Sequence, residues 1–288
     1  MTAQDNRLGI MLMCLTTFVF AMQDGISRHL ASEYNVYLVV MIRYWFFAAF
    51  VIALSARRPG GLRKAVQTQH LFLQCFRGAL LALEIVVTVL AFTLLGLTET
   101  HAIFICYPLI IAALSGPFLG EKVGWRRWTA IAIGMLGVLI ILEPGYGVFT
   151  PAAIVPLIGA LMFAVYGLLT RYVARTDGSA VSFFYTGTVG MVVMTAIGAF
   201  FWEPIVGTDW LWMLTLCCTG ILGHWLLIKT YDHAEASAVQ PFAYLQLPFA
   251  AALGMFAFGE NLRVNVAIGA VIVVGAGLFT LWRERETT

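Results

Sequence analysis

The chain has 288 residues, of which 61% are hydrophobic and 11% charged, and its formal net charge at pH 7 is +2. A soluble domain carries roughly 25% charged residues, so this composition excludes a single water-facing globule. A net charge this small says little about partners, and no nucleic-acid partner is expected.

Apolar stretches long enough to cross a hydrocarbon core roughly 30 Å thick recur along the whole chain. We expect each to be a helix, because lipid leaves no water to satisfy an open backbone and no stretch alternates like a barrel strand. The opening residues are too few and too polar for a secretory leader, so the first stretch is expected to remain as a span. The sequence predicts an all-α polytopic membrane protein with ten transmembrane helices. The predicted spans are Leu8 to Leu30, Val36 to Ala56, Leu71 to Leu95, Thr98 to Leu119, Trp128 to Leu142, Pro151 to Arg171, Ala180 to Trp202, Trp210 to Thr230, Ala236 to Phe258 and Val264 to Trp282.

Basic residues between these spans fall mostly on one side of the membrane. With the N-terminus inside, thirteen of them lie on the cytoplasmic side, and only Arg28 and Arg263 lie outside. This asymmetry predicts that both termini are cytoplasmic. The thirteen are Arg7, Arg57, Arg58, Arg63, Lys64, Lys122, Arg126, Arg127, Arg171, Arg175, Lys229, Arg283 and Arg285.

The two halves of the chain repeat one another. The stretch FVFAMQDGISRHLA, residues 18–31, returns 143 residues later as LMFAVYGLLTRYVA, residues 161–174. Five spans per half is an odd number, so the halves, 1–145 and 146–288, enter the membrane from opposite sides and form inverted repeats. Arg28 accordingly falls at the outer end of the first span and Arg171 at the inner end of the sixth. Inverted repeats are typical of secondary transporters, which hold substrate near the midplane where the halves meet. A duplicated bundle with a purely structural role is the alternative.

Two prolines fall near the middle of predicted spans, Pro108 in the fourth and Pro248 in the ninth. Each frees a backbone carbonyl and permits a kink. The sequence leaves open whether such a bend serves gating or packing.

Ionisable side chains inside the bilayer are functional candidates, because burying one costs at least about 2.5 to 3.5 kcal/mol. Asp24 and Arg43 fall at a similar depth in the outer half of the membrane and could pair across the first two helices. Glu84 lies near the midplane of the third span, with Arg77 two turns nearer the cytoplasm. These groups either line a polar cavity that binds solute or a coupling proton, or neutralise one another as Asp24 with Arg43 and Glu84 with Arg77.

Polar and aromatic side chains inside other spans complete the candidate site. His224 and Trp225 fall near the middle of the eighth span and Gln246 near the middle of the ninth. A tyrosine buried in a span needs a partner for its hydroxyl, although a single aromatic residue is more often part of a core. Embedded charges roughly balance, so the lining suits a flat, neutral or zwitterionic organic solute. The remaining candidates are Gln23, Tyr107, Tyr166, Tyr185 and Tyr244.

The spans, the five-helix inverted repeats and one recurring motif together resemble the drug/metabolite transporter superfamily, EamA type, over nearly the whole chain. The resemblance implies a multi-pass carrier of the bacterial inner membrane that works by alternating access, often coupled to an ion gradient, here a proton or sodium. Relatives in this family export amino acids and drugs, or take up S-adenosylmethionine and riboflavin. The residues that carry the resemblance are Pro108, Gly120 and Glu121, their repeat at Pro248, Gly259 and Glu260, and Arg43 followed by an aromatic run.

The aromatic, charge-balanced lining favours an aromatic metabolite, and riboflavin uptake is the function we expect. Efflux of amino acids or drugs is the alternative. A membrane-embedded enzyme is a remote alternative, suggested by Asp232, His233 and Glu235, but this cluster lacks the cysteine pair of a zinc deaminase. No nucleotide-binding loop occurs in the chain. We therefore expect no enzymatic activity, catalytic residue, cofactor or metal, and the sequence leaves transport direction, coupling ion and oligomeric state open.

Overall fold

The computed structural model describes residues 6–120, 124–142 and 151–284, and in these ranges the chain is helical and contains no strand. The elements are α1 Asn6–Glu33, α2 Val36–Ala56, α3 Gly61–Ala65, α4 Leu71–Phe104, α5 Tyr107–Leu119, α6 Trp125–Leu142, α7 Ile154–Val173, α8 Ser179–Gly198, α9 Asp209–His233, α10 Ala236–Ala243, α11 Gln246–Phe258 and α12 Val264–Glu284, with 3-10 turns η1 Pro151–Ala153 and η2 Ala199–Phe201.

Six helical stretches in the described ranges are long and apolar enough to cross a bilayer. They cover residues 7–33, 36–56, 71–119, 151–173, 179–201 and 209–233, and shorter apolar helices follow at 246–258 and 264–276. The prediction of an all-helical, polytopic membrane protein is therefore confirmed.

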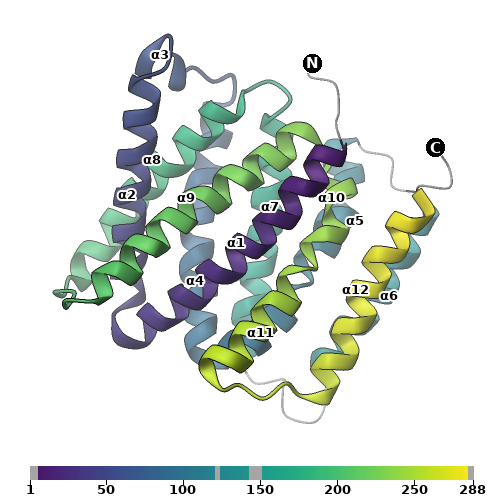
Figure 1. The fold of residues 1–288 in the computed structure, drawn as a ribbon. Helices are drawn as coiled ribbons and strands as arrows, with labels where there is room; N and C mark the ends of the chain where they lie inside the picture. The colour runs from purple at the N-terminus through teal and green to yellow at the C-terminus, as the bar shows by residue number, and fades with distance from the viewer. Residues whose placement is uncertain (1–5, 121–123, 143–150, 285–288) are drawn as a thin grey trace.

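Helix α1 crosses the middle of the bundle, with α9 along one side and α10 and α11 along the other (Figure 1). Behind it, α4 packs against α7 and α8, and α2 also packs against α8. Helices α6 and α12 pack against each other at one edge of the bundle (Figure 1). The start of α1, the end of α12 and the short helix α3 lie at the same end of the molecule (Figure 1).

The boundary expected between the third and fourth spans is a break inside α4 at Gly96, whose φ of 81° and ψ of 176° suit only glycine. The carboxylate of Glu260 accepts hydrogen bonds from the backbone N–H groups of Leu97 and Thr98, each at 2.8 Å. It thereby satisfies donors that the start of a new helix leaves without intrahelical partners. Arg28, near the C-terminal end of α1, forms an ion pair with the same carboxylate. Glu260, which follows α11, therefore joins α1 to α4. Glu121, the residue paired with it in the repeated motif, lies outside the described residues.

The fourth and ninth predicted spans are each interrupted. Helix α4 ends at Phe104 and α5 begins at Tyr107, while α10 ends at Ala243 and α11 begins at Gln246. Pro108 and Pro248 each lie in the first turn of the second helix, where a missing N–H costs no helical hydrogen bond. The predicted bends are thus present as full interruptions, and each span predicted as one helix consists of separate segments.

Candidate functional site

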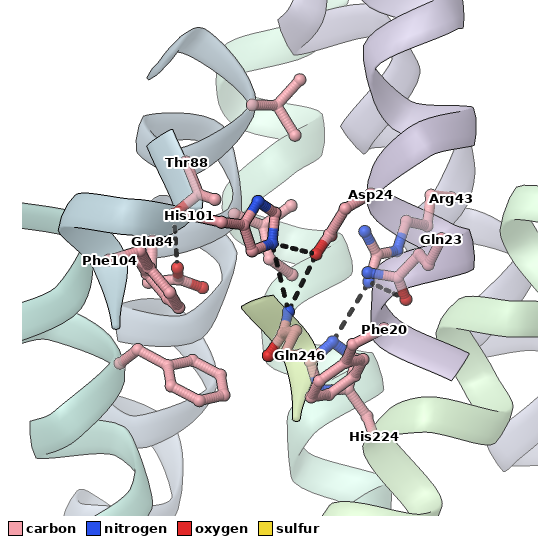
Figure 2. A pocket seen from close by; sticks show the side chains of 13 residues that line it. Phe20, Gln23, Asp24, Arg43, Glu84, Thr88, His101, Phe104, His224 and Gln246 are labelled. Carbon is pink, nitrogen blue, oxygen red and sulfur yellow. Dashed lines mark hydrogen bonds and ion pairs between the residues drawn. The ribbon is translucent and has the colours of Figure 1, made fainter. Parts of the chain in front are cut away.

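A cavity of about 40 Å³ lies between α1, α2, α4, α7, α9 and α11. Figure 2 shows the side chains that line it, with the rings of Phe20 and Phe104 beside polar groups. Phe163 of α7 also lines the cavity. The interrupted helices α4 and α11 reach it close to their breaks, and helix breaks at corresponding places in two halves mark binding sites in membrane carriers. Its ionisable and amide side chains are Gln23, Asp24, Arg43, Glu84, His101, His224 and Gln246.

Asp24 of α1 joins the segments that follow two of the breaks (Figure 2). Its Oδ2 atom lies 3.0 Å from Nε2 of His101 in α4 and accepts a hydrogen bond of 3.0 Å from Nε2 of Gln246 in α11. The other ring nitrogen of His101, Nδ1, lies 3.0 Å from the carbonyl oxygen of Leu97. The pairing of Asp24 with Arg43 that the sequence allows is absent from this part of the described structure, because the carboxylate faces His101 instead.

Arg43 of α2 lies beside Gln23 of α1, opposite Glu84 and Phe104 (Figure 2). Its Nη2 atom donates to Oε1 of Gln23 at 3.1 Å and lies 3.1 Å from Nε2 of His224. A guanidinium only donates, so Nε2 of His224 must accept, and the imidazole is neutral with its proton on Nδ1. This Nδ1 atom is buried and has no hydrogen-bond partner in the described structure. The ring of His224 is held between Phe20 and Phe47, whose centroids lie 5.2 and 6.3 Å away.

Glu84 lies in the membrane-spanning part of α4, with 3% of its surface exposed. Thr88, one turn later, donates a hydrogen bond of 2.6 Å to Oε1 of Glu84. No cation in the described ranges lies within ion-pair distance of it, so the predicted alternative of a Glu84–Arg77 clamp is not formed. Glu84 therefore remains a functional candidate that lines the cavity.

Arg77 belongs to a separate network that ties α4 to α7 and α8. Its guanidinium donates to Oε1 of Gln74 at 2.9 Å, to the hydroxyl of Tyr166 at 3.2 Å and to the carbonyl oxygen of Ser182 at 2.5 Å. Gln74 in turn donates to Asp177 at 2.9 Å. The negative charge of Asp177 is thus linked to Arg77 through Gln74. Arg77 is fully buried and does not line the cavity.

The predicted tyrosines divide by position. The Tyr166 ring lies edge-on to His224 at 6.5 Å, and the Tyr107 ring lies edge-on to the cavity residue Phe163 at 4.9 Å. Tyr244 is buried beside the break between α10 and α11. These residues back the cavity wall without being part of its lining.

Two predicted residues lie elsewhere. The Tyr185 hydroxyl donates to the carbonyl oxygen of Val66 at 2.9 Å, near α3, and Trp225 is 37% exposed on the outer surface of α9. Sequence reasoning also missed His101. It is an ionisable group three residues inside the predicted fourth span, so the rule that selected Glu84 would have selected it too.

A bundle of membrane-spanning helices, interrupted at two places around a polar and aromatic cavity, is the architecture of a membrane carrier. The chain belongs to the EamA-like transporter family, whose model matches residues 7–143 and again residues 150–282.

Relatives with known roles are also transporters. The chain is 25% identical to an S-adenosylmethionine uptake transporter of Rickettsia felis, over 91% of this chain and 88% of the relative. It is 27% identical to a riboflavin transporter of Rhizobium johnstonii, over 96% and 92%. A pseudopaline exporter of Pseudomonas aeruginosa is 23% identical, over 93% and 94%. A chain of known crystal structure shares the fold, with a TM-score of 0.69 over 98% of both chains at 19% identity.

The resemblance to drug/metabolite transporters is therefore confirmed, and the chain is a multi-pass membrane transporter of a small molecule. The names of the family and of these relatives are those of transporters and not of enzymes.

Proposed function

We propose that this transporter carries riboflavin into the bacterial cytoplasm across the inner membrane by alternating access. The observation that carries the proposal is the composition of the cavity, in which phenylalanine rings lie beside hydrogen-bonding groups of both charges. A flat isoalloxazine ring can pack on Phe20 and Phe163, since offset and edge-on aromatic contacts contribute beyond area burial. The bacterial relatives named as riboflavin transporters support the same substrate.

Hydrogen-bond donors left over in the cavity fit the carbonyl oxygens of such a ring. Nδ1–H of His224 has no partner, and Arg43 uses only Nη2 among its nitrogens for the hydrogen bonds described. Leaving a buried donor without an acceptor costs about 1 to 3 kcal/mol, which a carbonyl of the substrate would recover. His224 and Arg43 are therefore the residues proposed to bind the polar edge of the vitamin.

The cavity volume supports alternating access. Pockets for ligands of this size measure about 300 to 1,000 Å³, far more than the space between these side chains. The binding chamber must widen toward one side of the membrane before substrate enters. The breaks between α4 and α5 and between α10 and α11 provide segments that can move separately from the rest of each span.

Ten spans in two inverted five-helix repeats are the arrangement we propose for this cycle. The double match to the family model supports it, as does the packing, because α1 lies on α9, α10 and α11 while α7 lies on α4 and α5. The equivalent residues Phe20 and Phe163 meet at the cavity with their centroids 6.3 Å apart. Cytoplasmic termini are supported by α3, which carries Arg63 and Lys64 at the end where α1 begins (Figure 1).

S-adenosylmethionine uptake is the second candidate function. Two carboxylates, Asp24 and Glu84, line the cavity beside aromatic rings, and a sulfonium cation is attracted by both kinds of group. The rickettsial relatives named for this substrate support the same alternative.

Counterflow in proteoliposomes tests the proposal. Vesicles that contain purified protein and unlabelled riboflavin should take up labelled riboflavin saturably, and S-adenosylmethionine should not compete. Phe20→Leu should weaken riboflavin binding about tenfold, which corresponds to roughly 1.4 kcal/mol for a lost aromatic contact. Phe18→Leu is the matched control, because Phe18 is 47% exposed on the outer side of α1 and contacts Phe249 instead of the cavity.

Absence of riboflavin counterflow excludes riboflavin uptake, and counterflow of labelled S-adenosylmethionine without that of riboflavin would favour the second candidate. Direction is tested in a bacterium that cannot synthesise riboflavin. Growth on external riboflavin that depends on the transporter indicates uptake, whereas faster loss of preloaded vitamin indicates efflux.

A further inference from the structure

The hydrogen bonds around His101 require one more proton than a neutral His101 imidazole and an ionised Asp24 carboxylate carry together. Nδ1 lies 3.0 Å from the carbonyl oxygen of Leu97, which can only accept, so Nδ1 carries a hydrogen. A neutral imidazole then has a lone pair on Nε2, and Nε2 lies 3.0 Å from Oδ2 of Asp24. An ionised carboxylate is also only an acceptor, so two acceptors would face each other at hydrogen-bond distance.

A single added proton removes this conflict, whether it sits on His101 or on Asp24. We propose that Asp24 and His101 together form a binding site for one proton, and that this proton is the coupling ion of the transport cycle. This inference rests on the proposed transport function, which it extends from the solute to the ion that drives it.

The ligand chemistry favours a proton over sodium. Sodium is a hard cation and, like calcium and magnesium, is bound in proteins by oxygen ligands. The nearest polar atoms to Oδ2 of Asp24 are instead two nitrogens, Nε2 of His101 and Nε2 of Gln246, which themselves lie 3.4 Å apart. The amide of Gln246 donates to the carboxylate, so both described contacts of this oxygen are with nitrogen and not with the oxygen ligands that sodium prefers.

The charged and titratable groups around the pair come from several helices. Arg43 of α2, Glu84 of α4 and His224 of α9 face it across the cavity, and Tyr107 of α5 lies close enough to interact electrostatically with Asp24. Helix α7 contributes Phe163 to the lining, and α11 contributes the neutral amide of Gln246. The charges of Arg43 and Glu84 have opposite signs and offset each other. The net charge of the cavity lining therefore depends on whether the pair of Asp24 and His101 holds the added proton.

The position of the site connects the proton to movement. Asp24 lies on α1, His101 follows the break at Gly96, and Gln246 is the first residue of α11. While the proton is bound, these three segments are held together. When it leaves, two acceptors face each other at His101 and Asp24, so α1 is released from the part of α4 that follows Gly96, while Gln246 still donates to Asp24. Loss of the contact between α1 and α4 allows the chamber to open.

His224 provides the internal contrast. Its Nε2 atom faces Arg43, a donor, so its neutral form is satisfied without an added proton. The two cavity histidines therefore have different roles, one for the solute and the other for the proton.

Accumulation driven by a pH gradient separates coupling from transport itself. With the membrane potential clamped at zero, one coupled proton lets each pH unit of gradient support about tenfold accumulation of riboflavin. Asp24→Asn and His101→Gln should abolish accumulation while counterflow persists. His224→Gln is the matched control, since it should lower riboflavin affinity and keep the same accumulation per pH unit.

Outcomes for the two proposals are distinguishable. Wild-type counterflow without gradient-driven accumulation would overturn proton coupling and leave the transport function intact. Normal accumulation in both variants would overturn the assignment of the proton site to Asp24 and His101. Absence of counterflow with riboflavin and with S-adenosylmethionine would overturn the proposed function instead.

Spectroscopy then tests the proton site without any transport. In protein labelled with ¹⁵N-histidine, the His101 signal is identified by its loss in His101→Gln. If the added proton is on His101, both ring nitrogens should be protonated. If it is on Asp24, the infrared spectrum should show a protonated carboxyl that Asp24→Asn removes. A neutral His101 beside an ionised Asp24 throughout about pH 5 to 8 would overturn the site.

Discussion

Arg43 and Arg77 are both buried arginines on membrane-spanning helices, and their surroundings differ in kind. Arg77 donates to Gln74, Tyr166, Thr170 and the backbone of Ser182, so its guanidinium is nearly saturated by α4, α7 and α8. Arg43 has two partners, both on the same nitrogen, and it borders the cavity. Depth in the membrane therefore does not distinguish a structural charge from a functional one, whereas the completeness of its hydrogen bonding does.

The largest effect is expected when Arg77 is removed. Arg77→Met should destabilise the protein by about 3 kcal/mol or more, because it removes the donor from buried acceptors such as Oε1 of Gln74 and the Tyr166 hydroxyl. Thermal unfolding in detergent should show a much lower melting temperature. Arg77→Lys should recover only part of it, since an ammonium cannot reproduce the planar fork of donors.

Arg43→Met is the matched control for that substitution. Its partners Gln23 and His224 line the cavity, where they retain access to water or solute. The melting temperature should stay close to that of the wild type, while riboflavin binding and counterflow are lost. If both methionine variants unfold alike, or if Arg77→Met melts normally, the distinction between the two arginines does not hold.

The sequence predicted the helical membrane fold because apolar length alone specifies it, and it placed Asp24, Arg43, Glu84, His224 and Gln246 at compatible depths. It could not say which of them meet. In spans that are apolar on nearly every side, the sequence does not distinguish a buried face of the helix from an exposed one. Neither the partners nor the exposure of a side chain could therefore be assigned from periodicity.

Particular residues show where this information was missing. His101 reaches Asp24 only because the chain breaks at Gly96, and the Glu260 carboxylate that satisfies this break comes from the other half of the molecule. Trp225 shares the depth of its neighbour His224 but lies on an exposed face of α9, while His224 is buried. Arg77 was placed with Glu84 by spacing, yet its partners are Gln74 on the same helix and groups of α7 and α8.

Two glycines extend the comparison with a smaller change. A Cβ atom at Gly78, one residue after Arg77, would lie 2.9 Å from the Tyr185 carbonyl oxygen and 3.0 Å from Val189 Cβ, both on α8. Because backbone must move, Gly78→Ala should cost about 1 to 3 kcal/mol in unfolding free energy.

At Gly220 the added Cβ would instead lie 2.7 Å from Nε of Arg43, in a long side chain that can shift. Gly220→Ala should therefore leave the melting temperature unchanged or slightly higher, since alanine favours helix by about 1 kcal/mol. It should weaken riboflavin binding by displacing the guanidinium. Loss of stability in Gly220→Ala without a change in binding would contradict this assignment.

The smallest expected effect concerns Asp177, the carboxylate nearest to the Arg77 network, in the loop between α7 and α8. Burial alone would raise its pKa, but hydrogen bonds from Gln74, Thr68 and the Gln69 backbone lower the pKa below its usual value. A pKa lowered by folding adds stability above the unfolded value, about 3.9 for aspartate, and this stability is lost as pH falls through the folded value.

The melting temperature of the wild type should therefore decline on acidification, and Asp177→Asn should remove part of that decline while costing little at neutral pH, because an amide oxygen still accepts from Gln74. Asp232→Asn is the control, since the partly exposed pair of Asp232 with Lys229 joins neighbouring turns of one helix and contributes little. An unchanged acid response in Asp177→Asn would mean that Arg77 is stabilised by its neutral partners alone. The pH dependence of the melting temperature would then arise from groups outside this network. The pH dependence of transport would still be expected to arise at Asp24 and His101.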